Sequence, residues 1–260
     1  MQIINIHDIN LEGFKKLPVQ GTFSTTYSHE DTCYKLLDGL YYSERRDLYQ
    51  KLLRIEADNI KIDNALFPQA LIMDGNDLKG YTTPYISDAV NVSEKFYDSP
   101  EYLNINEFFK CVIKSDKILR QIHQNGIICQ DLTFENILVD SNGGCYFIDF
   151  DGCSYKDMKT LFISRMLSNF VVAYRKERIE IIANLDRISM MLSFFNIIFG
   201  KPIYCVNSFE YKKMSKHINT LNNLEPYVEM LLDKKNPIGY VPYLDEKIDI
   251  DDNYFIKLKK

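Results

Sequence analysis

The chain has 260 residues, of which 46% are hydrophobic and 26% charged, and its formal net charge is −5 at pH 7. This length can bury a large core, as one domain or two closely packed lobes, and the hydrophobic content excludes general disorder. The negative balance and the scattered basic residues argue against nucleic-acid binding.

The first ninety residues have the pattern of a strand-rich unit. Residues 21–27 and 31–37 read as two strands joined by the polar turn 28–31. Residues 43–58 have Leu48, Leu52 and Ile55 at helical spacing, with Ser43 as the expected N-cap. Residues 67–86 predict a hairpin that turns at 74–77.

From Asn106 onward the pattern becomes mainly helical. Residues 106–126 predict an amphipathic helix that ends at the cap Asn125-Gly126. Residues 127–149 predict strand, loop and strand, with a turn at 141–144. Residues 184–200 are apolar on nearly every side, a pattern typical of a helix buried within a helical lobe.

These elements predict an α+β protein with two lobes. The N-lobe, residues 1–86, would be small and β-rich with one helix. The C-lobe, residues 87–260, would be larger and helical, and a linker is expected near residues 86–104.

The cysteines and histidines give little sign of a metal site. The six Cys and four His show no C-x-x-C spacing, which favours free thiols in a reducing compartment. No apolar stretch is long enough to span a bilayer, and the first residues lack the pattern of a secretory signal. We therefore expect a cytoplasmic protein without a membrane partner, with export as an effector left open.

The segment IICQDLTFENILVDSNGGCYFIDFDG, which begins at Ile127, carries the chemistry. Asp131 and Asn136 lie on a loop after a helix, and the expected hairpin would carry Asp149 back towards Asn136. Two oxygen ligands that converge beside a third carboxylate suit a hard divalent cation holding a phosphate.

The same residues resemble motifs of the protein-kinase-like superfamily. IHQNGIICQDLTFENIL resembles the catalytic loop L-H-x-x-G-I-I-H-R-D-L-x-x-x-N, and FIDFDG resembles the D-F-G strand end. The resemblance implies the bilobal kinase fold. It implies that Asp131 orients the acceptor hydroxyl and that Asn136 and Asp149 bind the Mg²⁺ or Mn²⁺ bridging the ATP phosphates. By the same resemblance Leu138 forms the adenine floor, and Asp186 holds the catalytic-loop backbone.

The resemblance extends into the expected N-lobe. VQGTFSTTY resembles the glycine-rich loop with one glycine kept, and CYKLL resembles the strand whose lysine pairs with the phosphates. Thr83 would be the gatekeeper before the adenine hinge. The ATP-binding residues implied in this lobe are Gly21, Thr22, Phe23, Ser24, Cys33, Lys35, Thr83, Tyr85 and Ile86. Glu44 is the preferred ion-pair partner of Lys35, with Asp47 and Glu56 as alternatives.

Several positions depart from the family pattern. Cys129-Gln130 stand where His-Arg is usual, Thr133 stands where serine/threonine kinases carry lysine, and Asp151 replaces the glycine of D-F-G. Asp151 could therefore be a third metal ligand or a helix cap. Such departures also resemble compact, divergent bacterial kinase-like proteins.

Three functions follow from the resemblance. The leading one is a protein serine/threonine kinase, because the long segment between Asp149 and Asp186 leaves room for a peptide shelf. Thr133 and the Asp-Phe-Asp triplet favour a kinase for small molecules such as a metabolite or an antibiotic. The incomplete glycine loop favours a nucleotide-binding scaffold without turnover, a pseudokinase.

Overall fold

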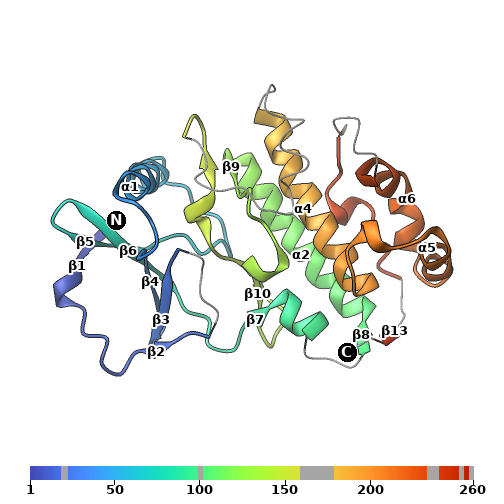
Figure 1. Ribbon diagram of the computed structural model, residues 1–260, viewed down its shortest axis with the longest axis horizontal. Coiled ribbons are helices and arrows are strands. Elements are labelled where there is room, and N and C mark those ends of the chain that lie inside the picture. The colour runs from blue at the N-terminus through green and yellow to red at the C-terminus, as the bar shows by residue number, and fades with distance from the viewer. Residues whose placement is uncertain (19–22, 99–101, 159–178, 233–239, 252–254, 258–260) are drawn as a thin grey trace. The chain divides into compact units, whose positions relative to one another are not determined.

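The structure is a computed structural model that describes residues 1–18, 23–98, 102–158, 179–232, 240–251 and 255–257 (Figure 1). The chain divides into two compact units, Met1–Asp88 and Ala89–Lys260. The first is built around one sheet, and the second contains most of the helices. The chain is therefore an α+β protein.

The N-terminal unit contains a six-stranded sheet in the order β1-β5-β6-β4-β3-β2 (Figure 1). The hairpin with its turn between Asp74 and Asp77 is confirmed, and so is the hairpin that turns before Thr32. β1 pairs in parallel with β5, and the other pairs are antiparallel. The strands are β1 (Gln2–Asn5), β2 (Lys15–Lys16), β3 (Thr25–His29), β4 (Thr32–Leu36), β5 (Ala70–Asp74) and β6 (Asp77–Pro84).

The helix of this unit, α1 (Tyr42–Ala57), buries the apolar face that its spacing predicts, and Lys51 is buried on the same face. The prediction that Ser43 is the N-cap is wrong, because the cap is Tyr41 and Ser43 lies in the first turn. The Tyr41 N–H donates to Glu44 Oε2 at 2.8 Å. An acid three positions after the cap can satisfy the cap's own N–H, which fixes the helix start before Ser43.

The C-terminal unit contains two long helices, α2 (Ile105–Gln124) and α4 (Ile179–Phe199), which lie side by side in Figure 1. The cap at Asn125-Gly126 is confirmed: Asn125 is the C-cap, and Gly126 follows with a φ of 74°. Two shorter helices follow, α5 (Ser208–Ser215) and α6 (Asn219–Leu232). The strands are β7 (Val90–Asn91), β8 (Tyr102–Asn104), β9 (Ile127–Ile128), β10 (Ile137–Val139), β11 (Cys145–Phe147), β12 (Ser154–Tyr155) and β13 (Phe255–Lys257).

The expected linker near residues 86–104 is not a linker. Its residues from Ala89 onward belong to the C-terminal unit, where β7 pairs with β10 and β8 pairs with β13. Both partner strands come from later in the chain, so the local pattern could not show that these short segments are paired.

An aromatic cluster joins the long helices to the loop that follows β9. Phe108 of α2 stacks on Phe194 of α4 with ring centroids 5.6 Å apart. Phe134, in a one-turn 3-10 helix (η3, Phe134–Asn136), meets Phe108 edge-on at 5.8 Å. Such pairs contribute roughly 0.5–1.5 kcal/mol each beyond the area they bury. The predicted burial of the helix at 184–200 is confirmed, because every residue from Asn184 to Phe195 is buried. The core therefore anchors the segment that carries Asn136.

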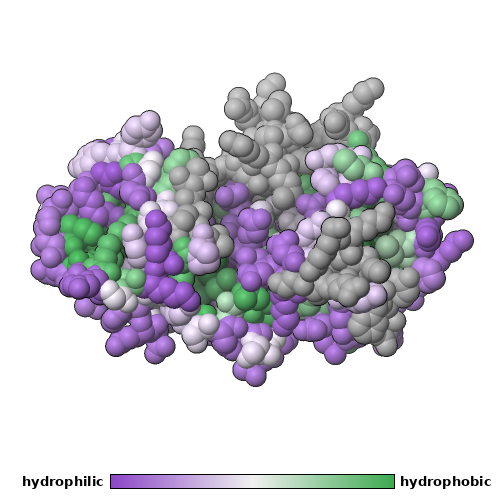
Figure 2. Space-filling view, turned by 60° about the horizontal axis from the view of Figure 1, so that its bottom comes forward, coloured by the Kyte–Doolittle hydropathy of each residue, from purple (hydrophilic) through white to green (hydrophobic). Residues whose placement is uncertain are grey.

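Hydrophilic side chains cover most of the face drawn in Figure 2, with hydrophobic ones in small areas between them. Among the residues that the structure describes, no helix is long and apolar enough to cross a membrane.

Asp116 of α2 is buried, and it accepts a hydrogen bond from the Asp245 N–H at 3.0 Å. Burial raises the pKa of this carboxyl to about 7, with the Asp245 carboxylate adding to the rise and Arg120 opposing it. An acid whose pKa is higher in the folded than in the unfolded chain stabilises the folded state while it is protonated. This contribution to the free energy of unfolding is lost as the pH rises from about 4 to 7.

We therefore expect the free energy of unfolding to fall by about a few kcal/mol from this group between pH 4 and pH 8. Asp116→Asn should flatten that slope in urea titrations, whereas Asp157→Asn, at an exposed position, should leave it unchanged. A slope equally steep in Asp116→Asn and wild type would contradict the prediction.

Candidate functional site

In the N-terminal unit, the pairing of β4 with β6 brings four of the relevant side chains onto one face. Cys33 lies opposite Thr83, and Lys35 lies opposite Tyr81. Lys35 Nζ lies 5.8 Å from the centre of the Tyr81 ring, close enough for a cation–π contact. Burial raises the pKa of the Cys33 thiol, against a hydrogen bond with Thr83 and the charge of Lys35. Cys33 is therefore a neutral thiol beside a cation.

Gly80 permits the close approach of these two strands. It lies opposite Leu36, and a Cβ at this position would collide with the carbonyl oxygen of Lys35. Any side chain here would push β6 away from the backbone of Lys35.

The other residues implied for ATP binding in this unit differ in their exposure to solvent, and two of them are not described. Gly21 and Thr22 lie outside the described residues. Ser24 is buried, and Phe23 is exposed. The Tyr85 N–H donates to the Asp31 carbonyl oxygen at 2.8 Å, so this N–H is used in a backbone hydrogen bond next to the paired strands β4 and β6. The half-buried Ile86 follows.

The three acids considered for Lys35 each have another contact. Glu44 accepts from the Tyr41 N–H at the start of α1. Asp47 lies 4.0 Å from the guanidinium of Arg46, and Glu56 pairs with the amino group of Met1. The pairing of Lys35 with Glu44 stays a prediction.

In the C-terminal unit, Asp186 of α4 fixes the backbone just before Asp131. Its two carboxylate oxygens accept the N–H groups of Cys129 and Gln130, both at 2.7 Å. This is the contact that the kinase resemblance implies for Asp186. Gln130 has a φ of 59°, a conformation that non-glycine residues adopt at a cost of about 1 kcal/mol or more. The buried carboxylate holds the loop in this conformation.

Asn136 is hydrogen-bonded to the backbone of Asp131 and to that of Ile148, the residue before Asp149. Its Nδ2 donates to the Asp131 carbonyl oxygen at 2.7 Å, which directs Oδ1 away from that carbonyl. The expected hairpin with its turn at 141–144 is confirmed, because β10 pairs with β11 and the Asp140 N–H bonds to the Gly144 carbonyl oxygen. At the base of this hairpin the Ile148 N–H donates to the Asn136 carbonyl oxygen at 3.0 Å. Asp149 is the next residue after Ile148, so this bond places the backbone of Asp149 near Asn136.

Asp131 and Asp149 are both exposed. Asp149 has a left-handed backbone, with a φ of 69° and a ψ of 54°, immediately before a 3-10 turn (η4, Phe150–Gly152). No cluster of three or more His, Cys, Asp or Glu suited to a metal occurs among the described residues. A carboxylate and an amide oxygen, completed by phosphate and water, nevertheless fit Mg²⁺, which usually keeps several waters.

Leu138, the expected adenine floor, is half-buried on β10 and lies opposite Tyr146 and Asn91. Its neighbours Ile137 and Val139 are buried on the other face of the same strand.

Two further side chains hold this loop, Ser189, which was not singled out from the sequence, and Thr133, for which the sequence did not indicate this contact. Ser189, one turn after Asp186 on α4, donates its hydroxyl to the Leu132 carbonyl oxygen. The Thr133 hydroxyl accepts the Glu135 N–H at 3.3 Å. The signal for Ser189 was present, since Asp186, Ser189 and Ser193 form a polar row at helical spacing in an otherwise apolar helix.

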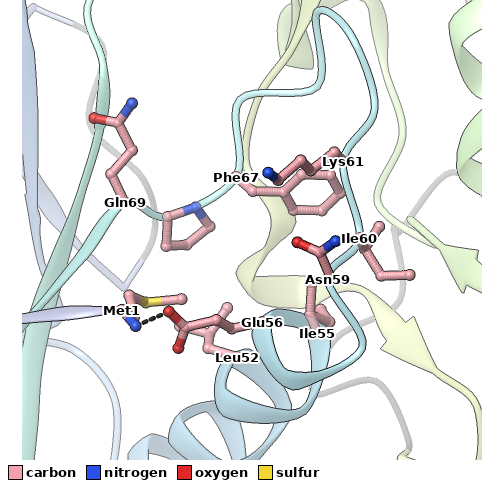
Figure 3. Close-up of a pocket in the computed structure, with 10 residues that line it drawn as sticks. Met1, Leu52, Ile55, Glu56, Asn59, Ile60, Lys61, Phe67 and Gln69 are labelled. Atoms are coloured by element: carbon pink, nitrogen blue, oxygen red, sulfur yellow. Dashed lines mark ion pairs between the residues drawn. The ribbon is translucent and has the colours of Figure 1, made fainter.

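Two of the pockets formed by the described residues can be compared with these positions. One, of about 230 Å³, lies in the N-terminal unit near the end of α1, where Met1 and Glu56 form their ion pair (Figure 3). None of the described residues implied for ATP lines it, which leaves Gly21 and Thr22 aside. The other, of about 530 Å³, lies in the C-terminal unit beside Thr133, Phe134 and Glu135. The rest of its lining is Ser93, Tyr97, Asp98, Ser193, Asn196, Ile197, Gly200, Lys201 and Pro202.

No protein-family model matches this chain, and no curated protein matches it in sequence.

Proposed function

We propose that the protein is an ATP- and Mg²⁺-dependent phosphotransferase of bilobal protein-kinase-like fold that transfers the γ-phosphate to serine or threonine hydroxyls of proteins. One observation carries the proposal: Asn136 bonds to the Asp131 carbonyl oxygen and to the N–H of Ile148, the residue directly before Asp149. In the proposed enzyme Asp131 would supply a carboxylate for the acceptor, and Asn136 and Asp149 would supply two oxygen ligands for a cation, which phosphoryl transfer requires.

Each residue has a separate part in the proposed reaction. The Asp131 carboxylate would accept a hydrogen bond from the acceptor hydroxyl and orient its oxygen for in-line attack. Asn136 Oδ1 and the Asp149 carboxylate would hold the metal ion, and Lys35 would contribute a positive charge to the phosphates. When bound, the metal neutralises charge that develops on the phosphoryl oxygens.

A second candidate is a small-molecule kinase, and the pocket beside Glu135 favours it. A volume of about 530 Å³ lies within the range of small-molecule sites, roughly 300–1,000 Å³. Asp98 and Glu135 add two exposed carboxylates to the lining, whereas Lys201 is paired with Glu210 at 2.8 Å. The acceptor would then be a metabolite that carries an amino group.

The test is transfer of label from γ-labelled ATP with Mg²⁺, comparing wild type with Asp131→Asn. We expect label in the protein itself or in a discrete lysate protein, and a fall to background in the variant. Asp157→Asn, at an exposed position of the same unit, is the control for removing one carboxylate charge.

The other outcomes select between the alternatives. ATP consumption that needs a metabolite extract and Asp131, without labelled protein, would favour the small-molecule kinase. Nucleotide binding without any phosphate transfer would contradict the proposal that the protein is an enzyme and would favour the pseudokinase alternative.

A further inference from the structure

A chain of hydrogen bonds within the C-terminal unit runs from Tyr243 to the loop before Asp131. The Tyr243 hydroxyl lies 2.7 Å from His123 Nδ1, and His123 Nε2 lies 2.9 Å from Asp186 Oδ2. The same carboxylate binds the N–H groups of Cys129 and Gln130. The side chain of His123 is 6% exposed and that of Asp186 is 0% exposed, so water contributes little to these bonds.

The direction of each hydrogen bond follows from the donors available. In a neutral imidazole only one nitrogen carries a proton, and because the Asp186 carboxylate only accepts, that nitrogen is Nε2 and Nδ1 is the acceptor. Tyr243 must then donate its O–H to Nδ1.

Tyr243 is itself held from two sides. The Arg120 guanidinium lies 4.0 Å from the centre of its ring, and the Arg187 guanidinium lies 5.1 Å from it. Arg120 also pairs with Asp245 at 2.8 Å and with Glu246 at 3.1 Å, just after Tyr243 in the chain. The short turn η7 (Leu244–Glu246) is thus fastened to α2.

We propose that Tyr243 is a positioning residue for the Asp131 loop, acting through His123 and Asp186. Its hydroxyl selects the His123 tautomer whose Nε2–H fixes the Asp186 carboxylate, and that carboxylate sets the backbone of Cys129 and Gln130. The segment that contains Tyr243, more than a hundred residues downstream, therefore fixes the backbone from which the Asp131 side chain projects. The consequence for catalysis rests on the proposed function, whereas the consequence for the loop does not.

The test compares Tyr243→Phe with Tyr240→Phe. Both remove one hydroxyl and keep the ring, and Tyr240 is 62% exposed with its ring against Arg187. We expect the Cys129 and Gln130 amides to exchange with deuterium about three- to tenfold faster in Tyr243→Phe and at the wild-type rate in Tyr240→Phe. Equal exchange in both variants, or equal acceleration in both, would overturn the proposal.

A second measurement uses the wild-type protein and needs no variant. Imidazole ¹⁵N shifts of His123 should show a neutral ring protonated at Nε2, and a ring protonated at Nδ1 would overturn the proposal. In phosphotransfer assays Tyr243→Phe should lower kcat with an unchanged KM for ATP. Faster amide exchange in Tyr243→Phe, together with no phosphate transfer by the wild-type protein, would support the positioning role of Tyr243 and contradict the proposed enzymatic function.

Discussion

Replacing Asp149 by asparagine is expected to lower Mg²⁺-dependent phosphotransfer by about a thousandfold or more, with the fold intact. Asparagine is similar in size but removes the negative charge that a hard cation prefers. Loss of about 4 kcal/mol of charge stabilisation in the transition state corresponds to a thousandfold change in rate. The exposed position of Asp149 indicates little effect on the free energy of unfolding.

The matched variant is Asp151→Asn, two residues on in the turn η4. If Asp149 is the metal ligand, initial rates should fall in Asp149→Asn at all Mg²⁺ concentrations, and Asp151→Asn should stay near wild type. The reverse order would assign the ligand to Asp151, an alternative that the sequence left open. Equal rates in all three proteins would remove both acids from the metal site.

Asp186→Ala is expected to reduce the free energy of unfolding by about 3–5 kcal/mol, the largest stability effect that we expect for a single side chain here. The carboxylate is fully buried and accepts from two backbone N–H groups and from His123. Its removal leaves three donors, one buried and two part-buried, without this acceptor, and a buried donor left unpaired costs about 1–3 kcal/mol. Gln130 would also lose the contact that holds its left-handed backbone.

Urea unfolding monitored by circular dichroism measures this change. Asp157→Ala, an exposed aspartate in the same unit, should stay within about 0.5 kcal/mol of wild type. Asp186→Asn should fall between the two, because the amide keeps one acceptor and turns the other into a donor. A loss below about 1 kcal/mol in Asp186→Ala would show that water replaces the carboxylate.

The sequence by itself predicted the elements whose signals are local. The strand pairs with their turns, the apolar face of α1, the cap at Asn125 and the burial of α4 all follow from periodicity and turn residues. The hairpin from Ile137 to Phe147 also follows, since its turn residues lie between two apolar strings. The start of α1 did not, because Tyr41, whose N–H is satisfied by Glu44 three positions later, competes with Ser43 as the cap, and the geometry of the preceding chain decides between them.

Only the tertiary structure decided what depends on contacts between distant segments. The pairing of β7 with β10 and of β8 with β13 joins strands too short to show a pattern of their own. The bond from Tyr243 to His123 joins residues separated by 120 positions, and no spacing rule connects them. The sequence therefore determined which residue types are available for phosphate chemistry. Long-range packing decided which buried partners hold them, because a hydrogen bond depends on distance in space.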